Sequence, residues 1–299
     1  MQDKPLVSVI MNCFNSDEFL RESIESIINQ TYKNWELIFW DNQSTDNSAS
    51  IAKSYNDSRI KYFYAPKFAP LYGARNYAVK EAKGDFIAFL DCDDLWKNDK
   101  LEKQISLMHN SDFGLCYTNF YIMGQNKNKK LFVKTQPSGY IFKQQIANYS
   151  IGILTVMISK KAYDNIEDKF DSSLNFPGDY DLFIRLLKNE KACYIDEPLA
   201  YYRASNANSI SNTKRLDNIK EVKVVLKKLK NMYSEKDILK RLDEAKAIMD
   251  IKEILFSLKD LNTREILRIL RDMSFKDAFS LTVLHKIISK ILRTLRWYS

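Results

Sequence analysis

The first ninety residues alternate between short apolar runs and longer stretches in which apolar residues recur every three or four positions. Runs rich in β-branched and aromatic side chains predict strands, and the three-to-four spacing predicts amphipathic helices. The predicted strands are residues 6–11, 35–40, 60–64 and 85–90. The predicted helices between them are residues 17–30, 44–55 and 73–82. Strands separated by such helices indicate βαβ units and a mostly parallel mixed sheet flanked by helices.

Beyond residue 100 the pattern loosens, and from about residue 214 it is helical throughout. The predicted helices of the middle part are residues 101–109 and 179–187. The predicted strands are residues 115–122, residues 131–133 as their hairpin partner, and residues 155–159. We therefore predict an α/β catalytic domain over residues 1–213, followed by a helical region over residues 214–299.

Positive charge is concentrated in the C-terminal region. Residues 214–299 hold 21 Lys and Arg against 12 Asp and Glu, whereas residues 1–213 hold 25 against 26. Residues 279–299 combine an apolar face with a basic face and an aromatic pair close to the end. This pattern fits an anchor at a membrane surface, and it also fits a helix packed on its neighbours with a solvated basic face. The interspersed acidic residues and the neutral body argue against nucleic-acid binding.

The composition excludes several kinds of site. Hydrophobic residues make up 45% of the chain and charged residues 28%, as in an ordinary folded protein. The two histidines, His109 and His285, lie in separate predicted helices, which argues against a histidine-based zinc site and against a Ser-His-Asp triad. Any general base is therefore expected to be a carboxylate.

The cysteines and the apolar runs indicate the cellular compartment. The four cysteines are far apart and form no C-x-x-C pair, so we expect buried, reduced thiols. No run has the eighteen or so apolar residues of a membrane span, and the N-terminal residues show no signal-peptide pattern. We expect a cytoplasmic protein that lies peripherally at the inner face of the membrane.

An acidic turn follows the apolar strand at residues 85–90. Asp91, Asp93 and Asp94 stand where open α/β sheets bind ligands. Crowded carboxylates repel one another, and a divalent cation that also takes diphosphate oxygens relieves this repulsion. Asp91 and Asp93 therefore suggest a metal–diphosphate site. The alternative is a strand-to-helix turn, with Asp94 or Asn98 as the helix cap.

Other polar loops follow strands at the same predicted edge, and together they resemble family 2 of the glycosyltransferases, whose nucleotide-sugar-binding fold is called GT-A. The similar stretches are residues 7–10 with 14–15, 41–46, 73–76, 84–94, 178–186 and 198–203. They follow one another in the order that the family has. The resemblance implies a GT-A fold and an inverting transferase of the kind that builds bacterial surface polysaccharides.

The resemblance also implies which residues bind the donor. Phe14, Asn15, Asp41, Arg75, Asn76, Asp91 and Asp93 are the implied donor-binding residues. Asp41 would accept a hydrogen bond from a uracil-like imide, and Arg75 would contact base or phosphate. Asp91 would bind ribose or metal, and Asp93 would ligate Mn²⁺ or Mg²⁺ on the diphosphate. The structural alternatives are a turn or cap for Asp41 and a salt bridge at a helix start for Arg75.

Asp179 matches the carboxylate that family members use to deprotonate the acceptor hydroxyl, so we expect it to be the general base. The alternative is that Asp179 or Asp181 caps the following helix. The implied activity is the metal-dependent transfer of a hexose or N-acetylhexosamine from a UDP-sugar to a hydroxyl of a glycan or lipid-linked saccharide. Donor sugar, linkage and oligomeric state stay open.

The chain departs from the family pattern at four places. Asn42-Gln43 replaces a frequent Asp-Gly, Gly178 stands where a glutamate is common, Asn12 replaces a frequent proline, and Ser205 stands about where many members carry a histidine. The turn after the first predicted strand contains no glycine, which argues against a dinucleotide-binding oxidoreductase, a P-loop enzyme and a nucleotidylyltransferase. The remaining alternative is a relative that binds sugar nucleotides, or acts as a scaffold, without turnover.

Overall fold

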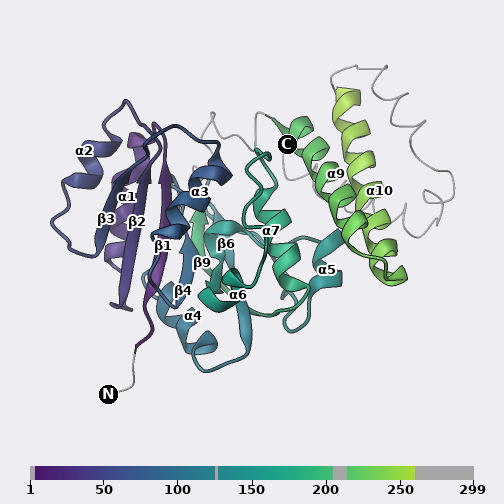
Figure 1. Ribbon diagram of the computed structural model, residues 1–299, viewed down its shortest axis with the longest axis horizontal. Helices are drawn as coiled ribbons and strands as arrows, with labels where there is room; N and C mark the ends of the chain where they lie inside the picture. The colour runs from purple at the N-terminus through teal and green to yellow at the C-terminus, as the bar shows by residue number, and fades with distance from the viewer. Residues whose placement is uncertain (1–3, 125–126, 205–213, 260–299) are drawn as a thin grey trace. The chain divides into compact units, whose positions relative to one another are not determined.

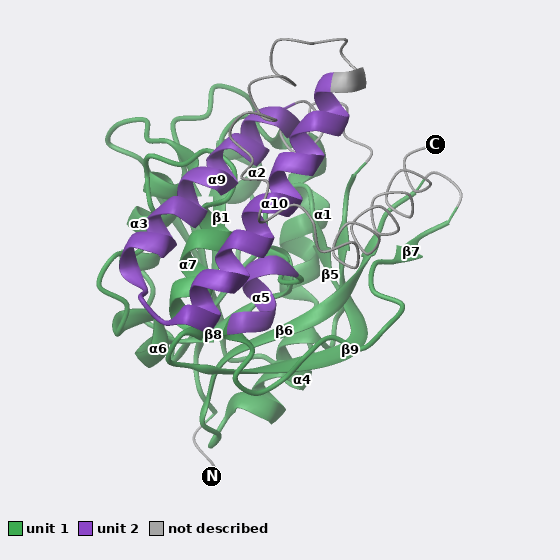
Figure 2. Cartoon of the chain, turned by 90° about the vertical axis from the view of Figure 1, so that its right-hand side faces the viewer, with its two compact units in different colours: residues 1–142, 150–209 green, residues 143–149, 210–299 purple. Residues whose placement is uncertain are grey.

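The computed structural model describes residues 4–124, 127–204 and 214–259. The chain forms two compact units, residues 1–142 with 150–209 and residues 143–149 with 210–299 (Figure 2). In the described part, no helix has both the length and the apolar character needed to cross a membrane. Residues 279–299 lie outside that part, so the membrane-surface helix stays a prediction, as does the division into a catalytic and an anchoring region.

The described residues of the first unit form one nine-stranded sheet in the order β3-β2-β1-β4-β8-β6-β9-β5, with β7 paired to β6 (Figure 1). The strands are β1 (Val7–Cys13), β2 (Trp35–Asp41), β3 (Ile60–Tyr64), β4 (Phe86–Phe89), β5 (Leu95–Trp96), β6 (Phe113–Ile122), β7 (Lys129–Lys130), β8 (Met157–Ser159) and β9 (Lys191–Tyr202). β1 is parallel to β2 and β4, whereas β8 is antiparallel to β4 and β6. The predicted mixed, mostly parallel sheet is confirmed.

Helices flank this sheet. They are α1 (Asp17–Ile28), α2 (Ser48–Lys53), α3 (Leu71–Lys80), α4 (Lys100–Met108), α6 (Lys160–Asp164) and α7 (Gly178–Leu187), with a 3₁₀ turn η1 (Ile153–Thr155). α5 (Phe142–Ala147) crosses from the first unit into the second. Alternate residues of β2 serve opposite faces. Leu37 belongs to the core cluster under α1, while Trp40 stacks on Tyr77 of α3 with ring centroids 5.7 Å apart.

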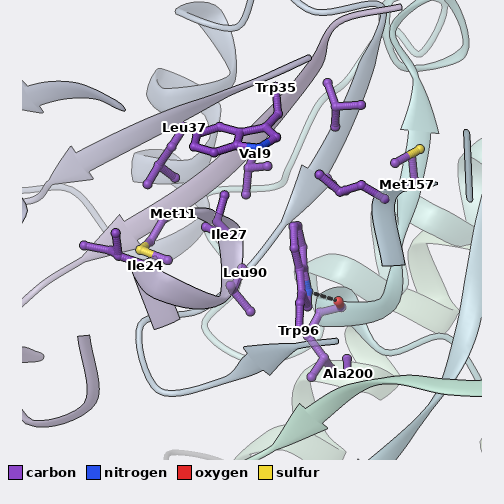
Figure 3. Packing of buried hydrophobic residues seen from close by; sticks show 14 of the residues in the cluster. Val9, Met11, Ile24, Ile27, Trp35, Leu37, Leu90, Trp96, Met157 and Ala200 are labelled. Atoms are coloured by element: carbon purple, nitrogen blue, oxygen red, sulfur yellow. Dashed lines mark hydrogen bonds between the residues drawn. The ribbon is translucent and has the colours of Figure 1, made fainter. Parts of the chain in front are cut away.

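The central strands are buried on both faces, as their predominantly apolar sequences predict. The polar Ser8 of β1 and Glu36 of β2 hydrogen-bond to each other inside the sheet. Every residue of β2 and β4 is buried, whereas the edge strand β3 is only partly covered. Figure 3 shows Ile24 and Ile27 of α1 beside Val9 and Met11 of β1. Burying each such side chain is worth about 1.5–3 kcal/mol. This core fixes the ends of β1, β2 and β4, where the polar loops begin.

Beyond β4, one strand prediction was wrong and one long strand was missed. The hairpin partner of β6 is β7 at Lys129–Lys130, not residues 131–133. A strand of two lysines carries no apolar signal, because both side chains are charged. Lysine is common on edge strands, where its charge discourages pairing with other chains. The twelve-residue strand β9 was missed because Pro198 and two acidic residues interrupt its apolar pattern. Pro198 stands at a register shift against β6, a position that tolerates proline.

The described part of the second unit contains α9 (Arg215–Met232) and α10 (Lys236–Lys259), as the helical spacing predicts. Their buried residues include Ile219, Leu226 and Leu229 of α9 with Ile238 and Leu242 of α10. Lys223 of α9 forms ion pairs with Asp250 and Glu253 of α10, both of which are buried. The pair of helices is therefore held by apolar contacts and by an enclosed charge cluster.

Candidate active site

The polar loops after β1, β2 and β4 meet at one edge of the sheet. β1 lies between β2 and β4 and is parallel to both, with Cys13 opposite Asp41 and Ile10 opposite Phe89. Connections leave β1 for β2 on one side and reach β4 on the other, so the strand order reverses at β1. Crevices at such reversals bind ligands in open α/β sheets. Phe14, Asn15, Asp41 and the acidic turn after β4 are thus brought together.

Asp41, the last residue of β2, is fully enclosed and held at both oxygens. Its Oδ1 accepts the N–H of Ser44 at 2.8 Å and its Oδ2 accepts the hydroxyl of Tyr62 at 2.6 Å. The turn interaction that was the alternative for Asp41 is therefore present. The carboxylate can still accept further hydrogen bonds, because each oxygen carries a second lone pair. Burial and this hydrogen bond also raise the pKa of Tyr62.

Asn15 joins the loop after β1 to the loop after β2. Its backbone has φ of 49°, in the left-handed region that asparagine tolerates. Its Oδ1 accepts the N–H of Thr45 at 2.8 Å, and its own N–H donates to the hydroxyl of Ser44 at 3.1 Å. Asn15 therefore holds the loop after β1 against the loop after β2.

The Asn42-Gln43 departure has a structural explanation. The Asn42 amide donates to the carbonyl of Ala69 at 2.8 Å and accepts its N–H at 3.2 Å, which ties the loop after β3 to the end of β2. Gln43 has φ of 69°, a conformation that favours glycine. The chain therefore keeps the backbone of a glycine turn while carrying a glutamine, at a cost of about 1–3 kcal/mol.

Two exposed phenylalanines face each other at this edge. Phe14 is 48% exposed and Phe68 is 54% exposed, and their rings meet edge to face with centroids 5.0 Å apart. Exposed aromatic surface of this kind is suited to stacking on a flat ligand. Phe68 was missed from the sequence because it lies in the irregular stretch between β3 and α3, where no pattern marks it.

Arg75 of α3 links the acidic turn to the rest of the site. It is buried, and its guanidinium lies 2.6 Å from Oδ1 of Asp91, whose side chain is 37% exposed. The salt bridge of the alternative interpretation is therefore present, although Arg75 stands in the middle of α3 and not at its start. A buried arginine with one half-exposed partner keeps positive charge at the edge of the site.

Asp179, in the first turn of α7, lies within the field of the same arginine. Burial raises the pKa of Asp179 to about 6, the positive charge of Arg75 opposes this rise, and the negative charge of Asp91 adds to it. Its Oδ1 accepts the N–H of Tyr180 at 2.8 Å, whereas the N-cap residue of α7 is Pro177 and forms no side-chain capping bond, so Asp179 does not occupy the cap position. Asp181, by contrast, is fully enclosed and paired with Arg185 at 2.7 Å, which removes it as a candidate base.

The rest of the acidic turn is held by Arg203, which directly follows β9. Its backbone N–H donates to Asp94 Oδ1 at 3.0 Å and its Nε donates to the carbonyl of Asp93 at 2.9 Å. Asp94 thus anchors β9. The N-cap residue of α4 is Asp99, without a side-chain capping bond, so neither Asp94 nor Asn98 caps this helix and the capping interpretation was wrong. Arg203 was not among the predicted site residues, although the Tyr-Arg pair after β9 belongs to the family resemblance.

Asp91 and Asp93 are the side chains that could hold a divalent cation. Burial, followed by the charge of Asp91, raises the pKa of Asp93 to about 6, as expected for two carboxylates that share a site. Among the described residues, no three His, Cys, Asp or Glu side chains form a metal cluster. Two oxygen ligands with open positions fit Mg²⁺ or Mn²⁺ completed by diphosphate oxygens and water. The residues present therefore fit the expected ion.

Asn76 is a further residue that was predicted to bind the donor. Asn76 donates to the carbonyl of Phe170 at 2.8 Å and accepts its N–H at 3.1 Å, so its amide clamps the segment before α7. This contact gives Asn76 a positioning role toward that segment.

The four cysteines are free and buried, as predicted, and Cys92 donates to the carbonyl of Asn12 at 3.3 Å.

Known proteins resemble this chain in sequence. A sequence model of "Glycosyl transferase family 2" matches residues 8–164. The chain is 36% identical over 212 residues to the UDP-Glc:alpha-D-GlcNAc-diphosphoundecaprenol beta-1,3-glucosyltransferase WfgD of Escherichia coli, covering 70% of this chain and 81% of that protein. It is 34% identical over 214 residues to the putative teichuronic acid biosynthesis glycosyltransferase TuaG of Bacillus subtilis, covering 71% and 83%.

Solved structures share the fold at lower sequence identity. Residues 1–349 of S. aureus TarS, crystallised with UDP-GlcNAc, superpose with a TM-score of 0.67 at 19% identity, covering 81% of this chain and 71% of that one. The mannosyltransferase PcManGT of Pyrobaculum calidifontis, in complex with GDP-Man and Mn²⁺, gives a TM-score of 0.61 at 14% identity, covering 98% and 81%. The predicted fold type is thereby confirmed.

Proposed function

Because the chain belongs to glycosyltransferase family 2, we propose that it transfers a hexose or N-acetylhexosamine from a UDP-sugar to a hydroxyl of a lipid-linked saccharide, with inversion at the anomeric carbon. Support comes from WfgD, whose name gives a UDP-glucose donor and a GlcNAc-diphosphoundecaprenol acceptor, from TuaG, which is named for teichuronic acid biosynthesis, and from TarS, which was crystallised with UDP-GlcNAc. The observation that carries the proposal is the position of Arg75, paired with Asp91 and acting on Asp179.

In the proposed complex, the donor lies along the edge formed by the ends of β1, β2 and β4. Phe14 and Phe68 offer aromatic surface to the nucleobase. Asp41, although buried in the structure, is the proposed acceptor of the imide N–H. Asp91 contacts the ribose, and Asp91 with Asp93 would hold the cation. When bound there, Mn²⁺ or Mg²⁺ supplies positive charge at the diphosphate of the leaving group.

Asp179 is proposed to act as the general base. As the acceptor oxygen attacks the anomeric carbon, its proton passes to the Asp179 carboxylate, and the bond between that carbon and the diphosphate oxygen breaks with its electron pair leaving on UDP. Attack from the face opposite the leaving group inverts the centre. A pKa of about 6 suits this role better than an ordinary aspartate, since the group stays ionised at pH 7 and is more basic.

The site of action belongs to the same proposal. We propose that the lipid-linked acceptor is used at the cytoplasmic face of the membrane. Residues 279–299 combine apolar and basic faces in their sequence, a pattern suited to such a surface. We propose that they bring the enzyme to that surface.

The direct test is a donor panel. Purified protein is incubated with UDP-, GDP-, dTDP- and CMP-sugars, an acceptor analogue that presents a saccharide on a lipid diphosphate, and Mn²⁺ or Mg²⁺, and transfer is followed by mass spectrometry. We expect transfer from one or two UDP-sugars. Binding of a UDP-sugar without transfer to any acceptor would favour the non-catalytic relative, and the absence of any nucleotide-dependent thermal shift would contradict the proposal.

A further inference from the structure

Gly178, the residue before the proposed base, packs directly on the ring of Tyr72. A Cβ added at Gly178 would lie 2.6 Å from both the Cδ2 and the Cε2 atoms of that ring. Side-chain carbons do not approach this closely, so the ring occupies the space that any side chain at position 178 would need. The departure from the family pattern at Gly178 is therefore matched by a large residue from α3, 106 positions earlier in the sequence.

Tyr72 is itself firmly held. It is 3% exposed, and its ring stacks on Phe170 with centroids 5.6 Å apart and planes 18° apart. Phe170 in turn meets Phe89, the last residue of β4, edge to face at 5.6 Å. The Tyr72 hydroxyl donates to the carbonyl of Phe176. One turn along α3, Asn76 clamps the backbone of Phe170 with both amide atoms, so α3 fixes the segment before α7 at several points.

The same ring also faces the charged groups of the site. The Arg75 guanidinium carbon lies 5.4 Å from the Tyr72 ring centroid. Asp179, which follows Gly178, interacts electrostatically with both Tyr72 and Arg75. Tyr72 is thus packed against the backbone of Gly178, which precedes the proposed general base, and lies close to the Arg75 guanidinium. Moving the ring, or pushing Gly178 off it, would change the distance between the Asp179 carboxylate and Arg75.

We infer that Tyr72 is a positioning residue for the general base: its ring, packed on Gly178 and hydrogen-bonded to Phe176, sets where the Asp179 carboxylate lies relative to Arg75. This inference rests on the proposed function, since it concerns the base of the proposed reaction. In this chain, the contact between the Tyr72 ring and Gly178 therefore helps to position Asp179, because Gly178 has no side chain that could do so.

The test is a double-mutant cycle on the full-length protein. Gly178→Ala adds the Cβ that collides with the ring, Tyr72→Leu removes the ring, and the double variant removes the collision by replacing the ring with a smaller side chain. We expect Gly178→Ala to lower kcat by about tenfold to a hundredfold while the donor Kd changes by less than about threefold, because small displacements of a reacting group are costly. The double variant should recover part of kcat relative to Gly178→Ala.

Two further variants separate positioning from general loss of stability. Tyr72→Phe keeps the ring and loses only the hydroxyl contact, so its kcat should stay within about fivefold of wild type, the loss expected for one neutral hydrogen bond. Gly114→Ala is the matched control. A Cβ there would lie 2.7 Å from the Cβ of Glu190, a comparable collision at the start of β6, at the opposite edge of the sheet from Asp91. Its kcat should equal that of wild type at temperatures where it is folded.

The outcomes distinguish this inference from the proposed function. If wild-type protein transfers sugar, and Gly178→Ala loses no more kcat than Gly114→Ala, then Tyr72 does not position the base. A loss of kcat in Gly178→Ala that is unchanged in the double variant would also overturn the inference, provided that both variants melt cooperatively. If wild-type protein neither binds nor transfers any nucleotide sugar, the proposed function itself fails.

Discussion

The two sides of the candidate active site are built by different means. On the donor side, Asp41 and Asp91 stand at or just after strand ends, and the sheet itself brings them together. On the side of the proposed base, Asp179 lies in the first turn of α7, whose position depends on aromatic packing with α3. The donor side is thus fixed mainly by backbone topology, while the base is fixed by side-chain contacts between distant segments. Substitutions of similar size should therefore have unequal consequences on the two sides.

The largest effect is expected from removing the base. Asp179→Asn keeps the size of the side chain but cannot accept the acceptor proton, so kcat should fall by about 10²–10⁴-fold with donor affinity nearly unchanged. Steady-state kinetics and calorimetric titration of the UDP-sugar measure the two quantities separately. Asp164→Asn, at an exposed aspartate paired with Lys160, serves as the control. Full activity of Asp179→Asn would refute the assignment of the base.

A smaller effect, located on the donor side, is expected from Asp93→Asn. With one of the two oxygen ligands weakened, donor affinity in the presence of Mn²⁺ should fall by about 10–100-fold, since the cation bridges protein and diphosphate. Donor affinity in a chelator should change little. Equal losses with and without Mn²⁺ would mean that Asp93 contacts the donor without a cation.

The pH dependence of kcat should show an acidic limb. Asp179 has a pKa of about 6, raised by burial, so it is ionised above that value and protonated below it. At saturating donor, kcat should therefore fall by about tenfold per pH unit below pH 6 and level off above pH 7. The pKa of Asp93 is also raised to about 6, so the donor KM must be measured across the same range. A flat kcat profile down to pH 5 would contradict a base with this pKa.

The smallest effect concerns the backbone of the donor side. Gln43 has φ of 69°, so Gln43→Gly relieves backbone strain and should raise the free energy of unfolding by about 0.5–1 kcal/mol after the cost in chain entropy. Urea denaturation measures the change. Asn110→Gly, at φ of 61°, is the control, because asparagine already tolerates this region and should gain nothing. A loss of stability in Gln43→Gly would show that the Gln43 side chain matters more than the strain.

The contrast between the two sides also explains what could be predicted from the sequence. β4, which precedes Asp91, is a continuous apolar run, and β2, which ends at Asp41, is apolar apart from Glu36. Because parallel strands place their ends together, the donor side could be predicted. The contact of Tyr72 with Gly178 could not be predicted, because it joins positions far apart in the sequence and depends on ring packing. Phe68 and the missed strand β9 likewise lie where proline, charge or irregular backbone hides the pattern.

Some features visible in the sequence needed the structure for their explanation. The Asn42-Gln43 departure proved to be a clamp on Ala69 followed by a left-handed turn. Arg203, part of a stretch similar to the family, proved to hold the acidic turn through Asp93 and Asp94. A motif gives the residue type and its place in the chain, whereas its hydrogen-bond partners depend on segments that the motif does not contain.

The measurement that tests the central claim most directly is the anomeric configuration of the product. Wild-type protein is given the UDP-α-sugar that the donor panel selects, together with the lipid-diphosphate saccharide acceptor, and the new linkage is assigned by NMR from the coupling constant of its anomeric proton. A single attack by an acceptor oxygen that Asp179 deprotonates predicts a β-linked product. An α-linked product would contradict the inverting mechanism and the role given to Asp179.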